Sequence, residues 1–188
     1  MKALAPASGD AAAAIADATL RQRSSGDPVR VPVGVIGPRD PTQAQYQIAE
    51  ALGAGLAGIG CAVICGGRGG IMEAVCKGAA GNGGVSIGVL PEAEPQAANR
   101  YVTHVIATGI GEARNAIIAR SALCLVAIGN SYGTLSEVAL GLQFGKQVIG
   151  LDGAAQVEGV VMADGVERAL ELVAACINGT PRSDRARK

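Results

Sequence analysis

Short apolar runs alternate with helical patterns along most of this chain. The runs are too short for core helices and end at glycine, proline or polar residues, as buried strands do. They span residues 31–36, 61–65, 85–90, 101–106, 122–128 and 147–151. Between the first two runs, apolar residues recur at helical spacing at Ile48, Leu52 and Leu56. This alternation predicts an α/β fold, with a doubly wound, mostly parallel sheet in one Rossmann-like domain.

The length of 188 residues suits a single domain, which we expect to span residues 30–179. Residues 1–29 lack the alternating pattern and are expected to be a mobile or loosely docked N-terminal extension, in which the alanine-rich stretch from Ala11 can form one helix. The charged residues 180–188 are expected to be a frayed tail. No apolar run approaches the ~20 residues of a membrane span, so no membrane partner is expected.

Charge and aromatic content argue against a nucleic-acid partner. Basic and acidic residues number 16 each, so no net positive field attracts a polyanion. With one Phe, three Tyr and no Trp, the chain lacks the aromatic platforms on which single strands stack. The five cysteines lie in apolar segments, as the reduced thiols of a cytoplasmic protein do. With a single histidine, no metal site is expected.

Glycines gather after the predicted strands. Gly37 follows the first strand, residues 66–70 the second, Gly109 and Gly111 the fourth, and residues 129–133 the fifth. Doubly wound sheets bind ligands beyond the carboxyl ends of their strands, so these loops should converge into one cleft. The loops match neither the P-loop spacing nor the Gly-x-Gly-x-x-Gly dinucleotide fingerprint.

The stretch from Gly129 to Glu137 joins the fifth strand to a helix that we expect to begin near Leu135. Unpaired N–H groups and the helix dipole at such a junction attract an anion. Gly133 lets a ligand approach the backbone closely, and Thr134 adds a hydroxyl. Glu137 is expected in the first helical turn, facing the ligand. The alternative is a tight turn followed by a solvated glutamate.

Two motifs resemble the LOG-like superfamily, which includes cytokinin-activating phosphoribohydrolases and molybdenum cofactor carrier proteins. They are Gly-Gly-Arg-Gly-Gly-Ile-Met-Glu-Ala at residues 66–74 and Tyr-Gly-Thr-Leu-Ser-Glu at residues 132–137. The resemblance runs from about residue 31 to residue 151. It implies the Rossmann-like fold and self-association as a homodimer or tetramer.

For the hydrolases of this superfamily, the resemblance implies a catalytic glutamate in the second motif and an Arg-Lys pair on the preceding helix. By position these are Glu137 and Arg114, with Asn115 where the lysine would stand. Arg114 and Glu137 are therefore the catalytic residues if the protein is an enzyme. Residues 129–131 read Gly-Asn-Ser where the hydrolases have Pro-Gly-Gly. This departure favours the carrier branch.

We expect the ligand to be held by loop glycines, by polar residues of the second motif and by two arginines. The candidate ligand-binding residues are Gly37, Gly66, Gly67, Arg68, Gly69, Gly70, Glu73, Arg114, Asn115, Gly129, Asn130, Ser131, Tyr132, Gly133, Thr134 and Glu137. Three of them have ordinary alternatives: Arg68 as a solvated turn residue, Glu73 as a stabiliser of its helix N-terminus, and Arg114 as a surface arginine. Asn99 and Arg39 are weaker candidates.

Two functions remain open. The one we favour is a soluble binding protein for a phosphorylated, nucleotide-like ligand, with molybdenum cofactor as a candidate cargo and no cofactor required. The alternative is a nucleoside 5′-monophosphate phosphoribohydrolase that releases base and ribose 5-phosphate. In that enzyme, Glu137 would stabilise an oxocarbenium-like sugar and Arg114 would bind the phosphate bidentately.

Overall fold

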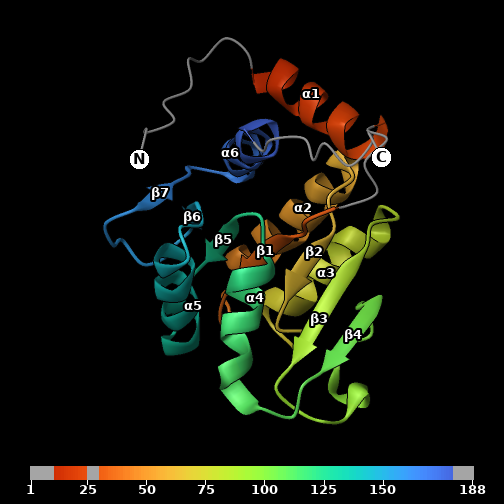
Figure 1. The fold of residues 1–188 in the computed structure, drawn as a ribbon, viewed down its shortest axis with the longest axis vertical. Coiled ribbons are helices and arrows are strands. Elements are labelled where there is room, and N and C mark those ends of the chain that lie inside the picture. Colours follow the sequence, from red (N-terminus) through yellow and green to blue (C-terminus); the bar gives the residue numbers. More distant parts are fainter. Residues whose placement is uncertain (1–10, 25–29, 180–188) are drawn as a thin grey trace, which may run out of the picture.

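The computed structural model describes residues 11–24 and 30–179. Within these residues lies one sheet of seven parallel strands, in the order β4-β3-β2-β1-β5-β6-β7 (Figure 1). The strands are β1 (Val33–Ile36), β2 (Val63–Cys65), β3 (Ser86–Leu90), β4 (His104–Ala107), β5 (Leu125–Ile128), β6 (Val148–Leu151) and β7 (Val160–Met162). The predicted single α/β domain of Rossmann type is confirmed.

Helices pack on both faces of this sheet. They are α1 (Ala11–Ser24), α2 (Gln43–Ile59), α3 (Ile71–Gly81), α4 (Asn115–Ser121), α5 (Tyr132–Gln143) and α6 (Val166–Gly179), with the 3-10 helices η1 (Pro95–Ala97) and η2 (Gly111–Arg114). Helices α2, α3 and α6 pack on one face, and α4 and α5 on the other. The two faces of β1 alternate accordingly: Val33 and Val35 belong to the first core, and Ile36 to the second.

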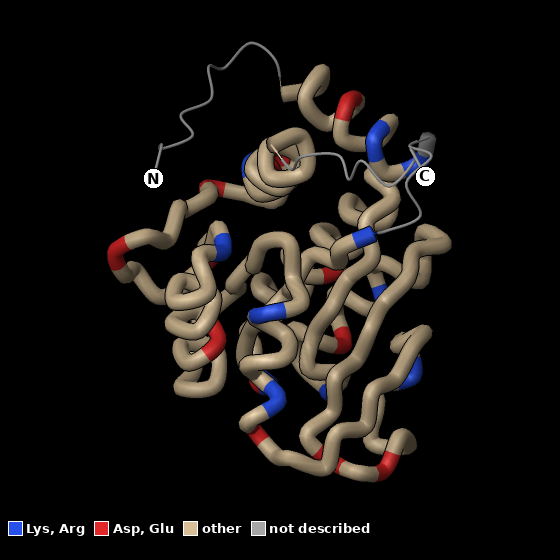
Figure 2. The backbone as a smooth tube through the Cα atoms, viewed as in Figure 1, with Lys and Arg blue, Asp and Glu red and all other residues tan. Residues whose placement is uncertain are grey.

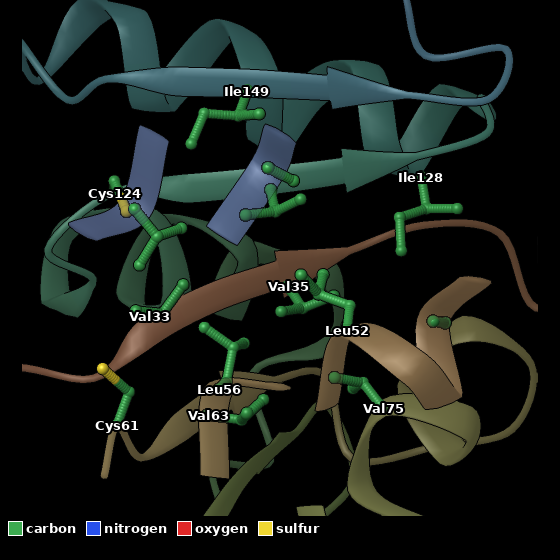
Figure 3. Close-up of a cluster of buried hydrophobic side chains, with 14 of the residues drawn as sticks. Val33, Val35, Leu52, Leu56, Cys61, Val63, Val75, Cys124, Ile128 and Ile149 are labelled. Atoms are coloured by element: carbon green, nitrogen blue, oxygen red, sulfur yellow. The ribbon is translucent and has the colours of Figure 1, made fainter. Parts of the chain in front are cut away.

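Aliphatic side chains fill the core between α2, α3 and the sheet. Figure 3 shows Leu52 and Leu56 of α2 with Val75 of α3 close to Val33 and Val35 of β1. All five side chains are fully buried. The five cysteines are free thiols, and four of them are buried.

The strand order reverses between β1 and β5. From β1 the chain runs outward through β2, β3 and β4, and then crosses to β5 on the other side of β1. The loops that follow β1 and β5 therefore diverge, which leaves a crevice at the carboxyl edge of the sheet. Gly37 and Gly129 directly follow these two strands.

Part of the predicted N-terminal extension is a docked helix. Residues 11–24 form α1, which packs against α6 and α2 (Figure 1). Ala18 is fully buried, and Arg23 Nη2 donates a hydrogen bond to the Gly58 carbonyl at the end of α2 at 2.9 Å. The remaining predictions of a mobile extension and a frayed tail concern residues 1–10, 25–29 and 180–188, which lie outside the described residues.

Charged residues of both signs are interspersed along the described chain (Figure 2). None of the described helices combines the length and the apolar character needed to cross a membrane. The absence of a nucleic-acid partner stays a prediction.

Candidate functional site

A cavity of about 470 Å³ opens at the crevice. It lies between the loops that follow β1, β2 and β5 and the η2 segment that leads from β4 into α4. It is lined by Val35, Ile36, Gly37, Arg39, Gly66, Arg68, Met72, Glu112, Arg114, Asn115, Ser131, Tyr132, Gly133, Thr134, Ser136 and Glu137. Residues that follow four different strands thus meet in one place.

The structure brings most of the candidate residues to this cavity, but not all. Those in its lining are Gly37, Gly66, Arg68, Arg114, Asn115, Ser131, Tyr132, Gly133, Thr134 and Glu137. Those outside the lining are Gly67, Gly69, Gly70, Glu73, Gly129 and Asn130. Gly70, with a φ of 70°, lies so close to the carbonyl oxygens of Pro38 and Arg39 that a side chain would clash there. Gly70 therefore allows the loops after β1 and β2 to pack closely against each other.

Helix α5 begins at Tyr132, three residues before the predicted start. Ser131 caps it, because its Oγ accepts a hydrogen bond from the Thr134 N–H at 3.1 Å. Glu137 therefore lies in the second helical turn, and its predicted place in the first turn is wrong. The early start places the N–H groups of Tyr132 and Gly133, which have no partner within the helix, beside the cavity.

Arg114 is a buried arginine in the cavity wall, only 5% exposed. Its Nη1 lies 3.5 Å from Glu137 Oε1 and donates a hydrogen bond to Asn115 Oδ1. Its Nη2 lies 3.9 Å from Oε2 of the exposed Glu112. Its Nε is buried without a hydrogen-bond partner. A buried guanidinium with an unused donor is suited to an anionic ligand.

Gly66 makes room for this guanidinium. A Cβ at Gly66 would lie 2.5 Å from Arg114 Nη2 and 2.6 Å from Met72 Sδ. Both distances are too short for van der Waals contact, so a side chain at this position would displace Arg114. The first glycine motif thus leaves the space that is occupied by an arginine far away in the sequence.

Asn115 connects Arg114 to helix α5. Its Nδ2 donates to Ser136 Oγ at 3.1 Å, and Ser136 Oγ donates to the Gly133 carbonyl at 2.7 Å. Both ends of the Asn115 amide are therefore used within the protein. At this position the hydrolases carry a lysine, whereas the amide here positions the arginine and adds no charge.

Burial dominates the electrostatics of Glu137. It raises the pKa of the Glu137 carboxyl to about 8; Arg114 works against this shift and Glu112 adds to it. Most Glu137 carboxyls are therefore protonated at neutral pH. The ion pair of Arg114 with Glu112 then remains, but its 3.9 Å distance and the exposure of Glu112 make it weak. The positive charge of Arg114 therefore favours an anion in the cavity.

Two further arginines lie at the cavity, Arg39 and Arg68. Arg68 Nη1 pairs with Glu92 Oε1 at 2.7 Å, and both side chains are partly exposed. Asn99 lies outside the lining, and its Nδ2 donates to the carbonyls of Gly67 and Arg68 at 3.1 and 2.9 Å. Asn99 therefore holds the second loop in place.

Sequence reasoning missed part of the lining. The missed residues are Val35, Ile36, Met72, Glu112 and Ser136. Met72 and Ser136 lie inside the two motifs, and Glu112 stands two residues before Arg114. The sequence could have indicated these residues through their positions next to candidate residues. Among the described residues, no cluster of three His, Cys, Asp or Glu side chains could hold a metal ion.

Residues 30–176 match the SLOG cluster4 family. An uncharacterized protein of Archaeoglobus fulgidus is 38% identical over 148 residues, which cover 79% of this chain and 95% of that protein.

Two solved structures show what the fold and sequence are similar to. The molybdenum cofactor binding protein of the phototrophic bacterium Rippkaea orientalis is 33% identical, with a TM-score of 0.77 over 80% of this chain and 99% of that one. The molybdenum cofactor carrier protein of Chlamydomonas reinhardtii is 35% identical, with a TM-score of 0.72 over 78% of this chain and 99% of that one. These matches confirm the resemblance inferred from the two motifs. The chain belongs to the SLOG cluster4 family.

Proposed function

We propose that this protein binds a phosphorylated, nucleotide-like ligand in the cavity and carries it unchanged, with molybdenum cofactor as the candidate cargo. The observation that carries the proposal is Arg114, which is buried in the cavity wall with its Nε unpartnered. The similarity to molybdenum cofactor carrier proteins supports the choice of cargo. The binding requires no further cofactor.

The phosphate would be bound between Arg114 and the N-terminus of α5. The N–H groups of Tyr132 and Gly133 and the hydroxyl of Ser131 belong to the same lining as the guanidinium. A helix N-terminus and an arginine both stabilise phosphate, through the dipole and through charge-assisted hydrogen bonds.

Three features support a carrier over a hydrolase. A protonated Glu137 cannot stabilise the positive charge of an oxocarbenium-like sugar as a carboxylate would. Asn115 stands in place of the hydrolase lysine, and its amide is occupied by Arg114 and Ser136. Residues 129–131 lack the Pro-Gly-Gly sequence of the hydrolases.

The proposal is tested on the protein purified from its own cells. The small molecules released on denaturation are identified by mass spectrometry, and molybdenum and phosphorus are measured per chain. We expect a phosphorylated molecule in wild type and much less of it in Arg114→Ala. A molecule without phosphorus, or equal amounts in the two proteins, would count against the proposal.

The 3.5 Å approach of Arg114 to Glu137 is the observation that favours the alternative, a phosphoribohydrolase. We expect wild type to release no ribose 5-phosphate from AMP above the rate of a protein-free control. In a hydrolase, Glu137→Gln would abolish release and leave AMP binding nearly intact, because the amide keeps the shape and loses the charge. Brisk release that this substitution eliminates would establish the enzyme.

Self-association as a homodimer or tetramer is part of the proposal. Ile106 of β4 and Ile117 of α4 are 47% and 38% exposed, and none of the described helices lies over β3 and β4 on the side of α4 (Figure 1). A second copy would bury these apolar side chains.

Light scattering should give at least twice the 18.7 kDa of one chain, and Ile106→Glu should lower the mass. Val161→Glu on β7, also exposed, is the control. A wild-type monomer at micromolar concentration would contradict this prediction.

The buried free thiols support a cytoplasmic location, which we include in the proposal.

A further inference from the structure

Tyr132 is the most exposed of the large hydrophobic side chains described, at 95%. It is the first residue of α5 and belongs to the cavity lining. Aromatic rings usually contribute to packing, because they bury a large apolar area. The Tyr132 ring buries almost no area, so packing within the fold does not explain why an aromatic residue stands at this position.

Tyr132 differs from the other aromatic residues of the chain in its position. The chain has three Tyr, one Phe and no Trp. Tyr46 and Tyr101 pack against the core beside the sheet, and Phe144 packs against the second core. Of these aromatic residues, Tyr132 alone lines the cavity.

We infer that Tyr132 is the specificity-determining residue of the site and stacks against a planar heterocycle of the bound ligand. The inference rests on the proposed function, and it narrows the ligand from any phosphorylated molecule to one in which a flat ring is joined to a phosphate. The exposed Tyr132 ring indicates a partner for the flat ring of the ligand. The buried Arg114, with its unpartnered Nε, indicates a partner for the phosphate.

The position of Tyr132 on α5 explains how one ligand can contact both the Tyr132 ring and the groups proposed to bind phosphate. The Tyr132 side chain and the N–H groups proposed to bind phosphate belong to the same helical turn. A ligand with its phosphate at this turn brings its attached ring near Tyr132. A sugar phosphate or inorganic phosphate fills the anion position and leaves Tyr132 in water. Stacking against an aromatic side chain therefore separates nucleotide-like ligands from simple phosphates.

The test compares wild type, Tyr132→Phe and Tyr132→Ala with three probes: inorganic phosphate, ribose 5-phosphate and AMP. Titration calorimetry should show that Tyr132→Ala weakens AMP binding roughly 5- to 100-fold. The same variant should change the Kd of phosphate and ribose 5-phosphate less than about twofold. Tyr132→Phe should keep most of the AMP affinity, because it retains the ring. Light scattering on each variant checks that the oligomeric state is unchanged.

Tyrosine fluorescence supplies a second readout, because the chain has no tryptophan. AMP should quench the emission of wild type, and ribose 5-phosphate should not. Most of the quenching should be lost in Tyr132→Phe, although that variant still binds AMP.

The outcomes separate the two proposals. If phosphate binds but AMP binds no tighter, or if Tyr132→Ala affects all three probes equally, the stacking role is wrong and the proposed function stands. If none of the three probes binds wild type, the proposed function fails and the stacking role fails with it.

Discussion

Replacing Glu137 by Gln should stabilise the protein at pH 9 and leave its stability at pH 5 nearly unchanged. We expect the free energy of unfolding to rise by about 2–4 kcal/mol at the higher pH. Glu137 is 6% exposed, and burial raises the pKa of its carboxyl from 4.5 to about 8. Urea titrations of both proteins at the two pH values measure the difference.

The sign follows from proton binding. Between pH 4.5 and about 8, the folded protein holds a proton on Glu137 that the unfolded chain has released. Wild type therefore loses stability as the pH rises through this range, up to a ceiling of about 5 kcal/mol. Gln has the shape of the protonated acid and can still accept a hydrogen bond from Arg114. It avoids the cost of a buried charge, so the gain appears only at high pH.

Glu158→Gln is the matched control, because Glu158 is exposed on the surface. It should change the free energy of unfolding little at either pH. A stabilisation by Glu137→Gln that is equal at pH 5 and pH 9 would contradict a buried, protonated carboxyl. So would a destabilisation at pH 9.

Replacing Arg114 by Ala should remove most of the anion affinity. Phosphate, sulfate or AMP should raise the melting temperature of wild type by mass action, because they bind the folded protein. Loss of the guanidinium should weaken this binding by roughly 1–3 kcal/mol, the scale of a charge-assisted hydrogen bond. Arg68→Ala should also weaken binding, but less, because Arg68 is engaged by Glu92 at 2.7 Å.

Arg120→Ala controls for the loss of one positive charge. Arg120 lies on α4, the helix that begins directly after Arg114; it is exposed and lies over the Phe144 ring at 5.0 Å. Its replacement should leave the anion-induced shift intact. An undiminished shift in Arg114→Ala would remove this arginine from the site.

The fold could be predicted because the strands of a sheet covered on both faces are almost purely apolar. Residues 125–128 at β5 are an example, since all four side chains are buried and apolar. Strand β7 was missed because it has only three residues and its side chains are largely exposed. A run of that length carries no periodic signal.

The start of α5 was missed for a different reason. Gly133 and Thr134 are poor helix formers, and they hid a first turn that begins at Tyr132. The signal that could have revealed it was Ser131, a favoured N-cap residue. The local hydrogen bond from the Thr134 N–H to Ser131 Oγ, and not intrinsic helix propensity, decides where α5 begins.

The loops that form the site could be predicted from the sequence, but the contacts between their side chains could not. The sequence indicated Arg114 and Glu137 separately, through their motif positions. Their approach to 3.5 Å, and the burial that raises the pKa of Glu137, depend on how α4 and α5 pack on one face of the sheet. The gap that Gly66 leaves for Arg114 is likewise a tertiary contact. Local patterns do not encode such contacts.

The central claim is that the cavity binds a phosphorylated ligand without cleaving it. The most direct measurement is a calorimetric titration of wild type with AMP at pH 7, followed by analysis of the nucleotide recovered from the sample cell of the calorimeter. We predict saturable binding with one site per chain and recovery of intact AMP. The absence of saturable binding, or the recovery of adenine and ribose 5-phosphate, would contradict the claim.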